Sequence, residues 1–203
     1  MEFKTKELLH ELKHHLPFTA IASLIGISSI LFINYILQAN ISESIFEVIH
    51  PIHIIFSAIV TSAIFYSYQK NKLKAILVGI TGAILIGSVS DTLFPYLGGL
   101  IFRLNVQLHL PIINEPIKIL TFALIGASIG TLTTKTKMSH ALHVFLSVFA
   151  SSSYLLAFSQ NFNTLFFIAA LIIIIIAVII PCCVSDIIFP FFFLNKKIKC
   201  CKC

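Results

Sequence analysis

Six long apolar segments, separated by short polar joints, dominate the sequence. The segments are Pro17–Leu37, Pro51–Tyr68, Ala75–Phe102, Ile119–Leu132, Ala141–Phe158 and Thr164–Leu194. A helix needs about 20 apolar residues to cross a bilayer. Only 11% of the residues are charged, whereas soluble domains carry about 25%. We therefore expect an all-α polytopic membrane protein with six transmembrane helices, which excludes an ordinary cytosolic enzyme, a disordered tail and a secreted disulfide scaffold.

The basic residues are distributed unevenly among the joints. Twelve of the 14 lysines and arginines lie before the first segment, in the second or fourth joint, or after the last segment. Because cytoplasmic loops are enriched in Lys and Arg, we expect a multi-pass cell-membrane protein with both termini cytoplasmic. The net charge of +6 then reflects orientation in the lipid bilayer, and we expect no nucleic-acid partner.

The two halves of the chain repeat the same landmarks in the same order. The second and fifth segments open with H-x-x-H at His50 and His140, and the third and sixth carry S-D-x-x-F-P at Ser90 and Ser185. The first and fourth segments share L-I-G-x-S around Gly26 and Gly126, and each follows a His-Leu-Pro. Since each half has an odd number of spans, the halves enter the membrane from opposite sides. This 3+3 inverted-topology repeat is common among secondary transporters.

The repeat divides the chain into four parts. A cytoplasmic N-terminal segment (1–16) precedes two three-span units (17–102 and 103–194), and a Lys/Cys tail (195–203) follows them. We expect no cleavable signal peptide, because the first apolar segment is too long and no small-residue cleavage site follows it.

Two carboxylates lie inside the apolar segments, and each belongs to an S-D-x-x-F-P motif. A charged side chain in hydrocarbon costs at least about 2.5–3.5 kcal/mol, so Asp91 and Asp186 point to a function shared by both halves. Pro95 and Pro190 remove backbone hydrogen-bond donors nearby. We therefore expect the third and sixth helices to be bent or broken near the motif, as is tolerated where helices line a cavity. A purely structural role, as helix caps or partners of buried donors, is the alternative.

Each half also carries histidines and hydroxyls at helical spacing. At about 3.6 residues per turn, positions 50, 53, 57 and 61 share one helix face, as do positions 140, 143, 147 and 151. Imidazole, carboxylate and thiolate together suit a first-row divalent ion. The metal ligands that we predict are His50, His53 and Asp91 toward the outer side, and His140, His143, Asp186 and Cys182 toward the cytoplasmic side. The predicted ion path is lined by Ser57, Thr61, Ser90, Ser147, Ser151 and Ser185.

These features predict a transporter for a divalent transition-metal ion, with protons as a coupling ion and without catalytic residues or an organic cofactor. An intramembrane metalloenzyme of the zinc-hydrolase type is the alternative, followed by a bis-His haem redox protein. A proton relay or a structural role would use the same residues. A homo-oligomer is compatible with these features.

Two terminal motifs stay outside this prediction. Residues 10–14 match H-E-x-x-H, which on a helix can hold zinc, but this segment precedes every span and has no clear third ligand. The tail cysteines Cys200, Cys201 and Cys203 suit either metal binding or palmitoylation.

Overall fold

The computed structural model describes residues 17, 21, 24–26, 28–29, 43–133, 136–159, 164–183 and 189–193. These residues are largely helical, and they contain no strand. The elements are α2 (Glu43–Tyr68), α3 (Lys72–Ser88), the π-helical turn η2 (Val89–Leu93), α4 (Phe94–Ile101), α5 (Pro111–Asn114), α6 (Pro116–Gly130), α7 (Thr136–Phe158), α8 (Thr164–Cys183) and α9 (Phe189–Phe192). The prediction of an all-α fold is confirmed over the described residues.

Two helical stretches are long and apolar enough to cross a membrane. One is Glu43–Tyr68, and the other is Lys72–Ile101, in which α3, η2 and α4 follow one another without a gap. Three shorter apolar helices, Pro116–Gly130, Leu142–Phe158 and Leu165–Pro181, overlap the predicted fourth and fifth segments and the first part of the sixth. Most of the predicted first segment lies outside the described residues.

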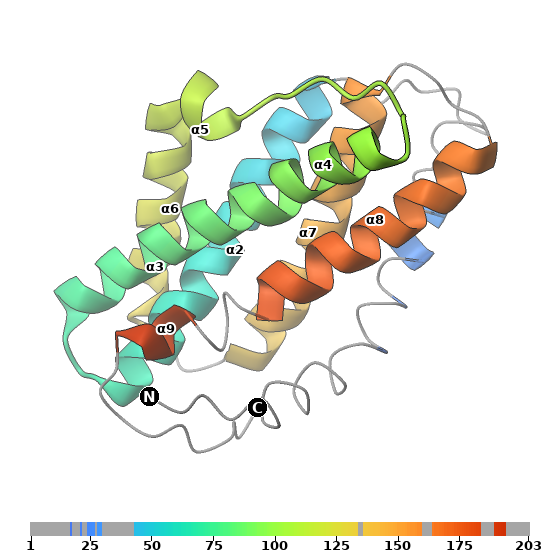
Figure 1. The fold of residues 1–203 in the computed structure, drawn as a ribbon. Helices are drawn as coiled ribbons and strands as arrows, with labels where there is room; N and C mark the ends of the chain where they lie inside the picture. The colour runs from blue at the N-terminus through green and yellow to red at the C-terminus, as the bar shows by residue number, and fades with distance from the viewer. Residues whose placement is uncertain are drawn as a thin grey trace.

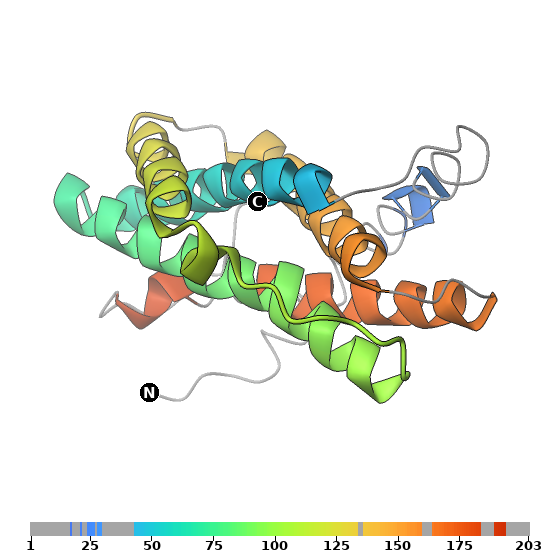
Figure 2. The ribbon, with the colours of Figure 1, turned by 90° about the horizontal axis from the view of Figure 1, so that it is seen from above.

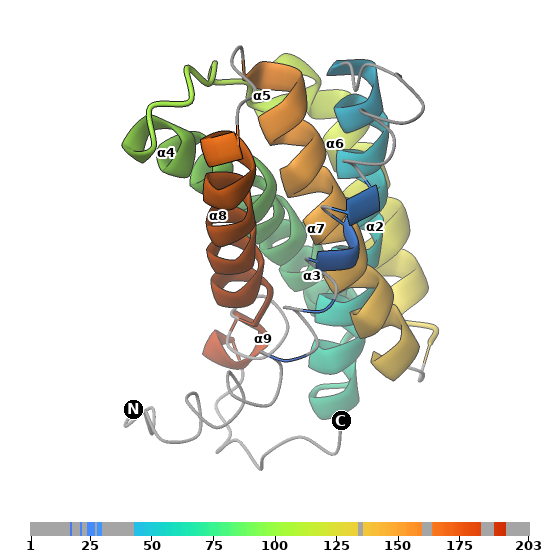
Figure 3. The same ribbon diagram turned by 90° about the vertical axis from the view of Figure 1, so that its right-hand side faces the viewer.

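The helices run alternately in opposite directions (Figure 1). The start of α2 and the ends of α4 and α7 lie at one end of the bundle, as Figure 3 also shows. The end of α2 and the starts of α3 and α7 lie at the opposite end. The short joints therefore alternate between the two ends.

The central element is α2, which packs against α3, α6 and α7. Seen from above, α6 and α7 flank it on either side (Figure 2). Glycines permit the close approach of α6, because a Cβ at Gly126 would meet the backbone of Ile55, and one at Gly130 the backbone of Ile59. The polar stripe of α2, comprising His50, His53, Ser57, Thr61 and Ser62, is also buried. Its two histidines face η2 and α7 instead of α6.

The second helix is longer than the predicted apolar segment Pro51–Tyr68. It begins at Glu43 and contains Pro51 in its interior. The additional turns are stabilised by Phe46, which is fully buried against Tyr154 and Phe158. His50 therefore lies within the helix and not at its solvated end.

The helix that carries Asp91 is continuous, although we expected a bend or a break there. Its irregularity is the π-helical turn Val89–Leu93, in which the N–H of Phe94 donates to the carbonyl of Val89. A π turn accommodates one extra residue without interrupting the helix, and such turns are frequent at functional sites. One continuous helix thus accommodates both the extra residue of the π turn and the missing N–H of Pro95.

Candidate metal centre

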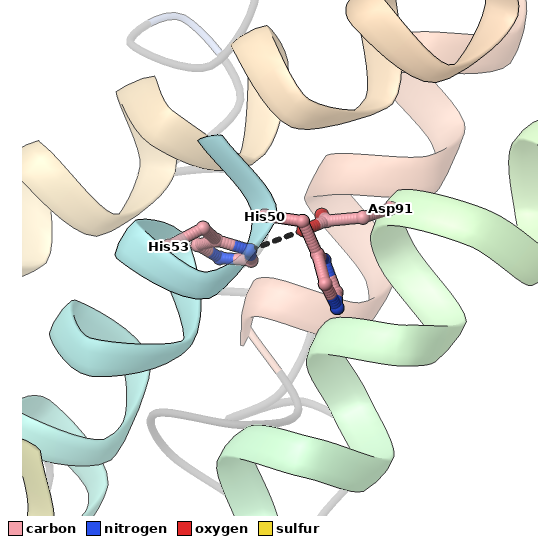
Figure 4. A group of neighbouring side chains, drawn as sticks. All are labelled: His50, His53 and Asp91. Carbon is pink, nitrogen blue, oxygen red and sulfur yellow. Dashed lines mark hydrogen bonds and ion pairs between the residues drawn. The ribbon is translucent and has the colours of Figure 1, made fainter. Parts of the chain in front are cut away.

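A buried aspartate of one helix meets two histidines of another. His50 and His53 lie one turn apart on α2, and Asp91 lies in η2. The Nδ1 atom of His50 is 2.8 Å from Oδ2 of Asp91, and the Nδ1 atom of His53 is 2.5 Å from the same oxygen. Figure 4 shows both imidazoles reaching from α2 to the carboxylate of the facing helix. One ligand atom from each residue lies within 4.8 Å of the other two.

The second oxygen of Asp91 is held by hydroxyl groups. The Oγ atom of Ser90 donates to Oδ1 at 2.7 Å, and the Oγ atom of Ser147, on α7, donates to it at 3.2 Å. Asp91 and both histidines are fully buried. Since a buried carboxylate is costly unless its oxygens find donors, these four contacts explain how Asp91 is accommodated in an apolar bundle.

The π turn and α7 together orient Asp91. The carbonyl of Ser90 receives no hydrogen bond from Phe94, which donates to Val89, or from Pro95, which has no N–H. The Oγ atom of Ser151 donates to this carbonyl instead, at 3.1 Å. A hydroxyl on α7 thus compensates for the proline in the S-D-x-x-F-P motif.

Aromatic rings enclose the two imidazoles. Phe46 stacks on His50, with ring centroids 5.4 Å apart, and His143 of α7 stacks on His53 at 4.7 Å. Among the described residues, the Nε2 atoms of His50 and His53 have no hydrogen-bond partner. A buried polar atom without a partner lowers the stability of the fold by about 1–3 kcal/mol. Binding of a metal ion or a proton at these nitrogens would offset this cost.

The other predicted site residues are only partly described. Ser57 and Thr61 are buried on α2, as the helical spacing predicts. His140 lies in α7 and Cys182 in α8, but their side chains are outside the described part of the chain. Ser185 and Asp186 lie wholly outside it. The inner half-site thus stays a prediction. Its one described side chain, His143, lies against His53 of the outer half-site.

A second group of possible ligands was not predicted. Glu43, Glu47 and His109 place one ligand atom each within 4.8 Å of one another, at the start of α2 and more exposed than the first group. The helical spacing of positions 43, 47 and 50 puts both carboxylates on the same face of α2 as His50. That spacing was visible in the sequence, whereas the contribution of His109 from a distant loop was not.

Two imidazoles and a carboxylate, all buried, form a site that can bind a divalent transition metal or exchange protons. Comparison of the chain with protein-family models, with curated proteins and with solved structures finds no match.

Proposed function

We propose that the protein is a multi-pass membrane transporter that binds a divalent transition-metal ion at His50, His53 and Asp91. The observation that carries this proposal is the fully buried His–Asp–His cluster inside an apolar helical bundle. Ionisable groups inside membrane helices are rare, and they usually mark the path of a substrate or an ion.

The donor set fits a zinc-like ion after a small opening of the cluster. Ligand atoms about 2.1 Å from a tetrahedral ion lie about 3.4 Å from one another. The Nδ1 atoms now lie 2.8 and 2.5 Å from Oδ2 of Asp91, so a shift of less than about 1 Å brings each pair to that separation. The hydrogens now shared with the carboxylate would move to the Nε2 atoms, since a neutral imidazole carries its hydrogen on either nitrogen.

The distribution of polar and apolar side chains supports a membrane environment. On α8, Ile168, Ile172, Ile176 and Ile180 follow one another every fourth residue, and each is 42–55% exposed. A surface helix of a soluble protein would turn polar residues outward, and large exposed apolar surfaces mark contact with a membrane or a partner. The buried interior, in contrast, holds histidines, serines and threonines.

Packing between the halves supports the inverted repeat. A Cβ at Gly126 would meet Ala58 on α2, and a Cβ at Gly26 would meet Val148, which occupies the corresponding position on α7. The elements that follow the two S-D motifs also have corresponding neighbours, since α4 packs against α7 and α8 whereas α9 packs against α2 and α3. In this proposal the halves move relative to each other around the ion, with both termini cytoplasmic.

The burial of the cluster favours an enclosed ion over hydrolytic chemistry. A zinc hydrolase needs an open position for water and room for its substrate. His50, His53 and Asp91 have no solvent-exposed surface. A proton relay would use the same contacts, but its activity would not depend on a metal.

Metal binding is tested with Zn²⁺ and the purified full-length chain. If the ion binds only the folded protein, Zn²⁺ at 100 times its Kd raises the free energy of unfolding by about 2.7 kcal/mol. We expect Asp91→Asn to weaken binding by about 100-fold or more, because even outer-shell partners of a metal contribute 10–100-fold.

The control is Glu115→Gln, which removes a surface carboxylate 2.6 Å from Lys118 and should leave Zn²⁺ affinity unchanged. Uptake of Zn²⁺, Mn²⁺, Co²⁺ and Ni²⁺ into proteoliposomes then tests transport. Equal Zn²⁺ affinity in the wild type and Asp91→Asn would contradict the proposed site, and metal-independent proton flux would favour the relay.

A further inference from the structure

A line of ring contacts connects the buried cluster to the surface. Phe46 stacks on His50 at 5.4 Å and contacts the edge of His109 at 6.0 Å. His50 and Phe46 are fully buried, His109 is 13% exposed, and Glu43, whose Oε1 atom is 3.3 Å from Nδ1 of His109, is 54% exposed. Along this line, one phenylalanine ring separates the innermost histidine from the partly exposed one.

Residues 102–110, which we call the strap, contact the ring of Phe46 through His109 and share its core cluster through Leu104 and Val106. The strap runs from α4 to α5 across the end of the bundle (Figure 1). The N–H of Gln107 donates to the carbonyl of Phe158 at 3.0 Å, and the hydroxyl of Tyr154 donates to the carbonyl of Gln107 at 2.9 Å. The N–H of His109 donates to the same hydroxyl oxygen at 3.2 Å. The strap is therefore attached mainly to α7, whereas Phe46 belongs to α2.

Phe46 lies in the first turn of α2, where fewer backbone hydrogen bonds hold a helix than at its centre. The carboxylates of Glu43 and Glu47 lie close to His109, the partly exposed histidine that contacts the ring, and they attract cations. We call these two glutamates and His109 the mouth.

We propose that Phe46 is the outer gate of the buried centre, and that ions reach His50 from the mouth when this ring swings aside. The role of this gate in transport rests on the proposed binding of a divalent ion. The gate itself concerns access to His50, which is measurable without any metal.

The first test is the reactivity of His50 in the metal-free full-length chain. Diethylpyrocarbonate modifies accessible imidazoles, and mass spectrometry of the fragments reports the rate at each histidine. We expect Phe46→Ala to raise the rate at His50 by at least about tenfold, because removing the ring leaves the site open where a closed gate now limits access.

The matched control is Phe65→Ala. Phe65 is equally buried on α2, but it packs with Ala75 and Val78 toward the other end of the helix. Its removal should leave the rate at His50 unchanged. Where Phe46→Ala does not fold, Phe46→Leu should give a smaller increase. An unchanged rate at His50 in the folded Phe46 variant overturns the gate.

The second test measures Zn²⁺ kinetics by stopped flow. In Phe46→Ala, association and dissociation should both accelerate about tenfold while Kd stays within about threefold, because a gate changes rates and not the bound state. Faster modification of His50 with unchanged Zn²⁺ rates would mean that the ion uses another route, which overturns the gate for ions. Absence of Zn²⁺ binding in the wild type refutes the proposed function, while the modification rates still decide the gate.

The contribution of the mouth can be measured separately from that of the gate, through the salt dependence of Zn²⁺ association. The double variant Glu43→Gln/Glu47→Gln should slow Zn²⁺ association about threefold to tenfold at low salt, and the difference should vanish near 1 M salt, where charges are screened. Glu115→Gln serves again as the control. Equal association rates in the double variant and the wild type would remove the mouth from the proposal.

Discussion

At the scale of single residues, Asp91 shows how contributions from two distant helices combine in one site. Its Oδ2 atom faces two imidazoles of α2, and its Oδ1 atom accepts hydrogen bonds from Ser90 and from Ser147 of α7. With both oxygens engaged, the carboxylate has little freedom to rotate. Ser147 therefore acts on the centre through Asp91, as a positioning residue.

We expect Ser147→Ala to weaken Zn²⁺ binding about tenfold, as loss of an outer-shell hydrogen bond typically does. Ser152→Ala is the control, because Ser152 is also buried on α7 but donates to the carbonyl of Val148 within its own helix. Isothermal titration of both variants checks the difference, and Ser147→Thr, which keeps the hydroxyl, should restore part of the affinity. Equal affinities in the two alanine variants would show that Ser147 only fills space.

The sequence predicts this residue-level picture in part. Helical spacing identifies the buried stripe of His50, His53, Ser57 and Thr61, and the repeated S-D motif identifies Asp91. That Ser147 contacts Asp91, and that Phe46 covers His50, depends on how α2, α7 and η2 pack. Such contacts between residues far apart in the chain leave no periodic signal in a single sequence.

At the scale of elements, glycines of α6 determine how closely this helix packs on α2. A Cβ at Gly126 would collide with the carbonyl oxygen and the Cα atom of Ile55. Backbone atoms cannot rotate away as a side chain can, so the helices would have to separate. A Cβ at Gly87, in contrast, would come closest to the terminal methyl group of Ile54, which can adopt another rotamer.

We therefore expect Gly126→Ala to lower the free energy of unfolding by about 1–3 kcal/mol, the usual cost of overpacking. Gly87→Ala should be neutral or slightly stabilising, since alanine is the better helix former by up to about 1 kcal/mol. Denaturant unfolding in detergent, followed by circular dichroism, measures both. A Gly126→Ala variant as stable as Gly87→Ala would contradict the close approach of α6 to α2.

Element boundaries were predicted less well than element positions. The apolar segments locate five described helical stretches, but α2 begins at Glu43, before the predicted segment Pro51–Tyr68. The preceding residues are helical because Phe46 finds partners on α7. The irregular region at Asp91 was located correctly, but whether proline produces a break or a π turn depends on a donor such as Ser151.

At the scale of the whole molecule, the alternation of joints between the two ends leads to a topology that can be measured. The loop after α2, around Lys70, lies at one end, and the strap and α5 lie at the other (Figures 1 and 3). The joint at Lys70 also holds three of the lysines, whereas the region from the strap to α6 holds only Arg103 and Lys118. The structure places these two regions at opposite ends of the bundle, and the positive-inside rule predicts that the end around Lys70 is the cytoplasmic one.

Reporter domains inserted after Lys70 and after Asn114 should therefore report opposite sides of the membrane, the first cytoplasmic and the second external. Both residues are exposed, so the insertions spare the buried centre. A reporter at the C-terminus should read cytoplasmic, because the sequence predicts three further spans after an external Asn114. Insertions at Lys70 and Asn114 that report the same side would contradict a membrane-spanning Lys72–Ile101 stretch. An external C-terminus would leave the second half with an even number of spans, which is incompatible with an inverted repeat of three.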